Sequence, residues 1–153
     1  LKTKLIVNKK IVHGEEIIQL ESAMGSAISC FETPRVLIVD RSRFLPVKTT
    51  SDLLYLRSDA ISWENNQLKV HRSTPTHISL SPHYQNITQL NQLISHSLSL
   101  KDCESLSLEG PFQIDSNVSF SGSVTLSNPS QNGIHLTSNS HFENVQVPFN
   151  HHN

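Results

Sequence analysis

The last third of the chain carries a regular alternation of apolar and polar positions. Apolar residues recur every six positions, and only Ser130 interrupts the series Leu100, Leu106, Phe112, Val118, Val124, Leu136 and Phe142. A second apolar series lies two residues further on, at Leu108, Ile114, Phe120 and Leu126. Residues i and i+2 face the same side of a strand, so the two series support each other. The pattern predicts a short parallel β-helix over residues 98–147, with three-sided coils of about 18 residues. An antiparallel meander of short strands is the alternative.

The first forty residues have the pattern of an α/β segment. Apolar runs around a His13-Gly14 turn predict short strands at 5–7, 11–12 and 17–20. From Glu21 to Phe31 the apolar residues fall on one helical face, which predicts a helix. Val36-Leu37-Ile38-Val39 is a continuous apolar run and predicts a strand that is buried on both faces.

A basic, hydroxyl-rich loop follows that last predicted strand. It contains Arg41, Arg43 and Lys48 together with four serines and threonines. Ligands of α/β sheets bind at the carboxyl ends of strands, and cations beside a helix N-terminus suit a phosphate. A solvated loop, with its arginines paired to Asp40 and Asp52, is the alternative.

Further elements are expected on the carboxyl side of this loop. Thr50 or Ser51 can cap a helix that has Asp52 in its first turn. Residues 60–70 predict a hairpin with Asn65-Asn66 at its turn and with Trp63 and Leu68 as anchors. Residues 84–95 predict a second helix.

Composition narrows the classes of partner and compartment. The 12 Lys and Arg residues balance 13 Asp and Glu residues, which argues against nucleic acid or an anionic membrane as partner. Cys30 and Cys103 have no partner spacing, which suits a reducing compartment. There is no long apolar run and no signal peptide, so a cytoplasmic protein is expected. The chain starts at Leu1, and we expect it to be a piece of a longer protein. Residues 148–153, which include His151-His152, are expected to form a tail.

Most catalytic motifs are missing from the sequence. It has no glycine-rich phosphate loop, no G-x-S-x-G elbow and no H-E-x-x-H. His135 or His141 would suit a hexapeptide-repeat acyltransferase, although such histidines are more often surface residues. Glu21 is either catalytic or a carboxylate at a helix start, and no metal ligands are expected.

Three segments together resemble the C-terminal part of UTP–glucose-1-phosphate uridylyltransferases (UDP-glucose pyrophosphorylases). The most specific is the run Arg41-Ser42-Arg43-Phe44-Leu45-Pro46-Val47-Lys48-Thr49-Thr50-Ser51-Asp52-Leu53-Leu54. Residues 6–8 and 19–28 match a second family stretch. In that stretch the family usually has Thr after the Glu, whereas this chain has Ser22 after Glu21. Residues 106–122 resemble the opening of the family's C-terminal β-helix.

The resemblance implies a nucleotidyl transfer. The phosphate of glucose 1-phosphate attacks the α-phosphorus of UTP, giving UDP-glucose and pyrophosphate. It assigns Lys48 to the nucleotide phosphates as catalytic and substrate-binding residue, with Mg²⁺ held mainly by the phosphates and by a preceding N-terminal domain. Arg41 and Arg43 are weaker substrate-binding candidates that more readily hold the loop, and Glu21 is a weak candidate near the sugar. Because that N-terminal domain also carries the nucleotide-binding loop, the isolated chain is expected to be inactive.

The expected fold is thus an α/β segment, the end of a Rossmann-like nucleotidyltransferase domain, followed by a short parallel, left-handed β-helix. The expected domains are residues 1–63 for the end of the catalytic domain, 64–97 for a connecting hairpin and helix, 98–147 for the β-helix and 148–153 for the tail. Three alternatives stay open: a β-helix self-association module, a pyrophosphorylase for another sugar nucleotide such as N-acetylglucosamine, and the acyltransferase.

Overall fold

The chain divides into two compact units in the computed structural model, which describes residues 3–149. Unit 1 is Leu1–Asp40 and unit 2 is Arg41–Asn153. The boundary lies at the start of the basic loop, inside the first predicted domain. The predicted domain boundaries at residues 63, 97 and 147 stay predictions. Most of the predicted tail, including His151-His152, lies outside the described residues.

Unit 1 is built on one long hairpin. β1 (Leu5–Val12) pairs antiparallel with β2 (Glu15–Ser22), and the turn between them places His13 at φ 53° and Gly14 at φ 85°. The turn was predicted, but the two separate strands expected before it are one strand. The polar segment between them pairs as well, because each of Asn8, Lys9 and Lys10 has a partner residue on β2.

The predicted helix of unit 1 is shorter than expected and of a different type. It is a 3-10 helix, η1 (Met24–Cys30), and Glu21 belongs to β2, where it pairs with Ile6. The hydroxyls of Ser26 and Ser29 donate to carbonyls three residues earlier. Such side-chain bonds compete with the α-helical pattern.

The predicted buried strand at 36–39 is wrong in this structure. The segment has no regular secondary structure, and Leu37 and Ile38 are 85% and 91% exposed. A strand that is buried on both faces needs a strand on either side and covering layers above and below. Within residues 3–40 the structure places no such neighbours, and no residue of that range is buried.

Unit 2 begins with the loop, two helices and a hairpin. Its elements up to residue 93 are η2 (Arg41–Arg43), α1 (Thr50–Arg57), β3 (Ile61–Glu64), β4 (Gln67–Val70), β5 (His77–Leu80), η3 (Pro82–Tyr84) and α2 (Ile87–Leu93). The β3–β4 hairpin has Asn65 and Asn66 at positive φ, as its turn type requires. Trp63 and Leu68 pair across it but are exposed, so they do not anchor the hairpin in the core.

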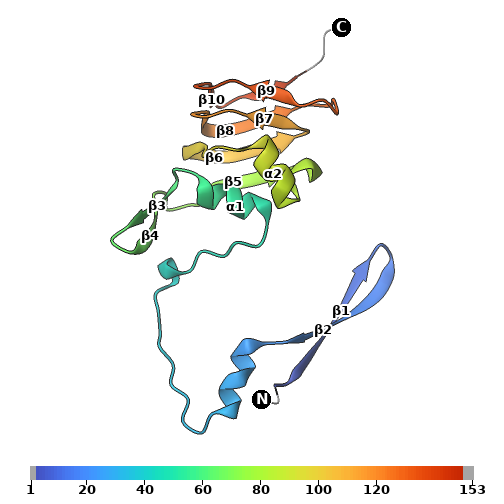
Figure 1. Cartoon of the computed structure of the whole chain (residues 1–153), viewed down its shortest axis with the longest axis vertical. Coiled ribbons are helices and arrows are strands. Elements are labelled where there is room, and N and C mark those ends of the chain that lie inside the picture. Colours follow the sequence, from blue (N-terminus) through green and yellow to red (C-terminus); the bar gives the residue numbers. More distant parts are fainter. Residues whose placement is uncertain (1–2, 150–153) are drawn as a thin grey trace. The chain divides into compact units, whose positions relative to one another are not determined.

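The rest of unit 2 is a stack of parallel coils. Its strands are β6 (Ser99–Glu109), β7 (Phe112–Ile114), β8 (Ser119–Ser127), β9 (Ile134–Leu136), β10 (His141–Glu143) and β11 (Gln146–Pro148). One sheet has the order β10-β8-β6-β5, with β11 also on β8, and β7 pairs with β9; all these pairs are parallel. Figure 1 shows the strands as successive layers. The alternative of an antiparallel meander is therefore wrong.

The two apolar series form the centre of this stack. All their members are buried except Phe142, which is partly buried and stacks on Phe120. Leu106 pairs with Val124, whereas Phe112 pairs with Ile134, a partner that lies further along the sequence than the regular period would place it. The extra residues follow β8. The buried side chain of Asn128 holds this insertion by donating to the carbonyls of Pro111 and Asn132.

A buried tyrosine connects α2 and its preceding turn to the coils. The Tyr84 hydroxyl accepts a hydrogen bond from the Phe112 backbone N–H at 2.8 Å and donates to the Phe112 carbonyl at 3.4 Å. Leu90 and Ile94 are buried on the same side. The second helix is thus confirmed, but it is shorter than predicted and begins at an Asn86 cap. Within residues 3–149 no helix is long and apolar enough to cross a membrane.

Candidate active-site loop

The loop before α1 presents one lysine on a firmly built helix start. Thr49, one residue before the predicted caps, is the N-cap of α1 and forms a capping box with Asp52. The Asp52 Oδ2 atom accepts hydrogen bonds from the backbone N–H groups of Lys48 and Thr49 at 2.9 and 2.8 Å, and from the Thr49 hydroxyl. These bonds, led by the one from the Lys48 backbone, lower the pKa of Asp52. The capping box therefore holds the backbone of Lys48 in place.

The side chain of Lys48 is left available by this arrangement. Lys48 is exposed, and its Nζ makes no ion pair or hydrogen bond to any residue between 3 and 149. A lysine on a fixed backbone with a mobile tip can follow phosphate oxygens as charge shifts. The helix N-terminus next to it favours negative charge.

Arg41 and Arg43 lie on η2 and differ in their contacts. The Arg41 guanidinium stacks on the Phe44 ring, 4.7 Å from its centroid, and donates weakly to the Phe44 carbonyl at 3.5 Å. Arg43 is exposed. Among the described residues neither arginine pairs with Asp52, whose bonds go to Lys48 and Thr49 instead. The contacts of Arg41 thus lie within the loop, and its part in substrate binding stays a prediction.

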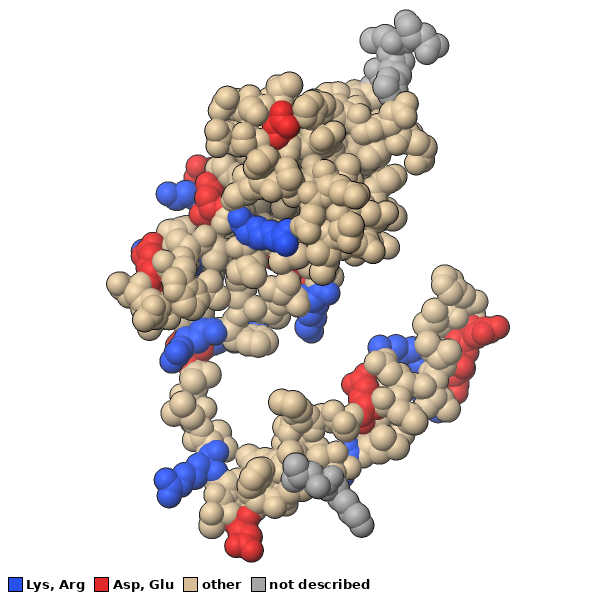
Figure 2. Space-filling model, viewed as in Figure 1, with Lys and Arg blue, Asp and Glu red and all other residues tan. Residues whose placement is uncertain are grey.

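Glu21 was expected at the start of a helix. It lies instead on β2 of unit 1, where it is exposed. Lys48, Arg41 and Arg43 belong to unit 2, so the four predicted site residues are divided between the two units. Figure 2 shows Lys and Arg interspersed with Asp and Glu over the visible face rather than gathered into one basic patch. A phosphate backbone binds along a continuous basic track, and neither unit shows one on this face.

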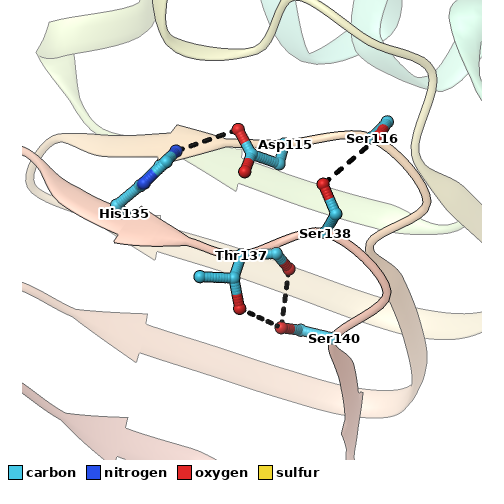
Figure 3. A network of polar contacts seen from close by, with 6 residues as sticks. All are labelled: Asp115, Ser116, His135, Thr137, Ser138 and Ser140. Carbon is cyan, nitrogen blue, oxygen red and sulfur yellow. Dashed lines mark hydrogen bonds and ion pairs between the residues drawn. The ribbon is translucent and has the colours of Figure 1, made fainter.

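The two histidines considered for acyl transfer are part of polar ladders on the coils. His135 Nε2 lies 2.9 Å from Asp115 Oδ1 on the coil before it (Figure 3). Beside this pair, the hydroxyls of Ser116 and Ser138 form a hydrogen bond between the same two coils. His141 contacts the hydroxyls of Ser119 and Ser121 through its two ring nitrogens. These contacts link neighbouring coils, which is a structural use of the side chains.

One group of residues was not singled out from the sequence. Tyr55 on α1 and Arg72 after β4 line a cavity of about 820 Å³ together with Arg41 and Phe44. Arg72 stands outside any motif, and Tyr55 has the spacing of an ordinary core residue on α1. The cavity is formed by contacts between segments that are distant in sequence, so no local signal could have revealed it.

The arrangement of coils and loop has counterparts among solved structures of sugar-nucleotide pyrophosphorylases. A UDP-glucose pyrophosphorylase from Leishmania major matches with a TM-score of 0.75 and 30% identity, over 95% of this chain and 33% of that one. A UDP-glucose phosphorylase from Trypanosoma brucei matches with a TM-score of 0.77 and 32% identity, over 97% of this chain and 35% of that one.

Sequence comparison identifies the family. The sequence model described as UTP–glucose-1-phosphate uridylyltransferase matches residues 1–121, and the chain belongs to this family. The enzyme of that name from Saccharomyces cerevisiae is 33% identical over 98% of the chain, and the one from Hordeum vulgare is 37% identical over 82%. The chain spans about a third of the length of these relatives.

Proposed function

We propose that this chain is the C-terminal portion of a uridylyltransferase that makes UDP-glucose and pyrophosphate from UTP and glucose 1-phosphate. The observation that carries the proposal is the run from Arg41 to Leu54 in a member of this family. It presents an exposed Lys48 with no intramolecular partner among residues 3–149, directly before the capped start of α1.

In the proposed reaction an oxygen of the sugar phosphate forms a bond to the α-phosphorus of UTP, and the bond from that phosphorus to the bridging oxygen of pyrophosphate breaks. Negative charge gathers on the nonbridging and leaving oxygens. Lys48 offers a compact charge with three N–H donors to these oxygens, and the capping box keeps its backbone still. Catalysis of this kind rests on alignment and electrostatic stabilisation. Arg41 and Arg43 support the loop, and Glu21 stays a weaker candidate on the sugar side.

Magnesium would supply further positive charge in this proposal, but the part of the chain that the structure describes offers it no site. Residues 3–149 hold no cluster of three or more His, Cys, Asp or Glu side chains suited to a metal. Asp52, the carboxylate nearest to Lys48 in sequence on the helix side, already accepts three hydrogen bonds at Oδ2. We therefore assign Mg²⁺ to the substrate phosphates and to residues outside this chain.

The isolated chain is proposed to be inactive because unit 1 lacks the surroundings that its side chains require. Its apolar residues are exposed, and none of residues 3–40 is buried. The test is an assay of the 153-residue chain with UTP, glucose 1-phosphate and Mg²⁺. No UDP-glucose above the blank is expected, and steady formation of UDP-glucose would refute this part of the proposal.

The role of Lys48 is best tested in the parent protein. The 17.1 kDa chain covers 32% of its yeast relative, so an immunoblot of the source cells should show a native product of about 50 kDa. We place this product in the cytoplasm. In that protein, Lys48→Ala should lower kcat by a factor of about 10² to 10³. Lys48→Arg should restore part of the loss, and Lys101→Ala, which removes another exposed lysine, should change little. An unchanged kcat in Lys48→Ala, or a native product no larger than this chain, would overturn the assignment.

A second function, self-association, is favoured by the open end of the coil stack. We propose that the stack is the family's left-handed β-helix and that its last strands, β10 and β11, form an edge open to a second copy. Sedimentation across a concentration range should then show association. Replacing His141 and Gln146 by Lys should abolish it. Replacing Leu37 and Ile38 by Asp in unit 1 should not. A strict monomer, or association that only the unit 1 variant removes, would contradict the module.

A further inference from the structure

A cavity in unit 2 has the features of a ligand site separate from Lys48. Its volume is about 820 Å³, within the range of sites that enclose a small organic molecule. Its walls come from the loop before α1, from α1 itself, from β4 and from β5 with the segment before it. Pro46 and Ser51 line it, but Lys48, which lies between them in sequence, does not. The cavity and the Lys48 side chain therefore use different faces of one loop.

The walls combine apolar surface with positive charge. Phe44, Leu45, Leu68, Val70 and Ile78 supply apolar side chains. Three cations line the cavity, Arg41, Lys69 and Arg72, against the single carboxylate of Asp52. That carboxylate accepts three hydrogen bonds at Oδ2, and Lys69 is paired with Glu64 outside the cavity. These hydrogen bonds come from neutral groups, so Asp52 keeps its charge, and the lining still has an excess of positive charge from its two arginines.

Arg72 is the group best placed to hold an anion. It is partly buried, and within residues 3–149 it forms no ion pair; its Nε donates to the Thr74 carbonyl at a long 3.4 Å. The four N–H donors on its two terminal nitrogens have no partner among the same residues. A guanidinium without a carboxylate is a fork suited to a phosphate or carboxylate group.

A buried tyrosine forms part of the same wall. Tyr55 lines the cavity and is 6% exposed, and its hydroxyl oxygen is buried. Burial raises the pKa of Tyr55, while the charge of Arg72 and the Thr76 backbone oppose that rise. Tyr55 therefore adds its ring to the cavity wall, and its buried hydroxyl is not available to a bound molecule.

We propose that this cavity binds a small organic oxyanion, a phosphate or carboxylate carried on an apolar ring. The anion is held by the guanidinium of Arg72, and the ring lies against the apolar walls beside the Arg41–Phe44 stack. Because the cavity and Lys48 share the loop from Arg41 to Asp52, occupancy of the cavity would act on the position of Lys48. The site itself does not depend on the proposed transfer reaction.

The test is an NMR titration of the isotopically labelled 153-residue chain with phenyl phosphate, with benzoate in a parallel arm to distinguish the two oxyanions. Saturable shifts are expected for the amides of Thr76 and Ile78, with inorganic phosphate at least about tenfold weaker because it lacks the ring. Arg72→Gln should weaken binding of phenyl phosphate at least about tenfold. Tyr55→Phe keeps the ring in the cavity wall and removes only a buried hydroxyl, so it should leave binding unchanged.

Two further variants separate this site from the proposed active site. Lys101→Gln removes an exposed charge outside the cavity and should leave the affinity unchanged. Lys48→Ala should also leave it unchanged. If Arg72→Gln binds phenyl phosphate like the unmodified chain, or if Lys48→Ala abolishes binding, the proposal is wrong. Absence of saturable binding by either oxyanion would overturn it as well, and none of these results bears on catalysis by Lys48.

Discussion

Unit 1 and unit 2 contain similar apolar runs but differ in what those runs contact. In unit 1, Val36, Leu37 and Ile38 are mostly exposed, and none of residues 3–40 is buried. In unit 2, the apolar residues of β6 and β8 are almost wholly buried. The difference lies in the neighbours: each coil of unit 2 covers the next, whereas a two-stranded hairpin has no layer to cover it.

Unit 2 thus supplies its own core, whereas the apolar residues of unit 1 have no covering layer within residues 3–40. Both tyrosines and the single tryptophan belong to unit 2, so their near-ultraviolet circular dichroism reports on that unit alone. Unfolding in urea, followed by this signal, can therefore separate the two units.

The first variant pair makes the same chemical change in the two units. Leu106 in β6 is 1% exposed and Leu37 in unit 1 is 85% exposed. Leu106→Ala should lower the free energy of unfolding by about 2 to 5 kcal/mol, because it removes buried apolar surface and leaves a cavity. Leu37→Ala should change it by less than about 0.5 kcal/mol. A large effect of Leu37→Ala would show that unit 1 packs on the core of unit 2 in solution.

The second pair compares two glycines at positive φ. Gly110 has φ 90° and a Cβ there would overlap the Asn128 carbonyl oxygen, whereas Gly14 has φ 85° with no atom within 4 Å. Gly110→Ala combines backbone strain with overlap against a neighbouring coil, so a loss of about 3 kcal/mol is expected. Gly14→Ala should leave the unfolding transition of unit 2 in place. Equal transitions for the two variants would mean that the coils at Gly110 are looser than the structure has them.

The third pair concerns two buried tyrosines of unit 2. Tyr84→Phe leaves the Phe112 N–H without its partner and should lower the free energy of unfolding by about 1 to 3 kcal/mol. Tyr55→Phe removes a hydroxyl that makes no hydrogen bond and should have almost no effect. The same urea titrations measure both variants. A larger loss in Tyr55→Phe than in Tyr84→Phe would contradict the assigned contacts.

The pH dependence of unit 2 follows from the same burial. Burial raises the pKa of Tyr84 from 10.0 to about 12 and that of Cys103 from 9.0 to about 11. The unfolded chain loses these protons first as the pH rises, so stability is complete below pH 9 and is lost between about pH 9 and 12. Tyr84→Phe should remove only the Tyr84 share of this loss, between about pH 10 and 12, and leave the Cys103 share between about pH 9 and 11. A stability that does not change between pH 9 and 12 would show that these groups are hydrated in the folded chain.

The smallest effect is chemical and leaves stability unchanged. Cys30 in unit 1 is exposed and Cys103 in β6 is buried. Iodoacetamide reacts with the thiolate, which burial suppresses at Cys103. Mass spectrometry should find one adduct on the native chain, none on Cys30→Ser and two on the unmodified chain in urea. Two adducts under native conditions would show that the coils open readily.

Much of unit 2 could be predicted because its signals are local and repeated. The six-residue apolar period predicted which residues of the coils are buried, and Asn65-Asn66 predicted the hairpin turn, since only a few residue types accept positive φ. The loop around Lys48 could be located from its charge and hydroxyl content. The pairing of Phe112 with Ile134 could not be foreseen. Ser130 marks an interruption of the apolar series, but the sequence does not show that the insertion there brings Leu136 opposite Ile114.

The sequence alone determined the family, the parallel stacking signal and the position of Lys48 before a capped helix. Only the tertiary structure decided the rest. The 36–39 run did not become a strand, since a strand depends on partners that no local pattern contains. The Tyr84 hydroxyl bonds to Phe112, and Tyr55 and Arg72 meet at one cavity, because the chain returns to the same place after many residues. Local periodicity encodes which side of an element is apolar, but contacts between distant segments depend on the packing of the whole unit.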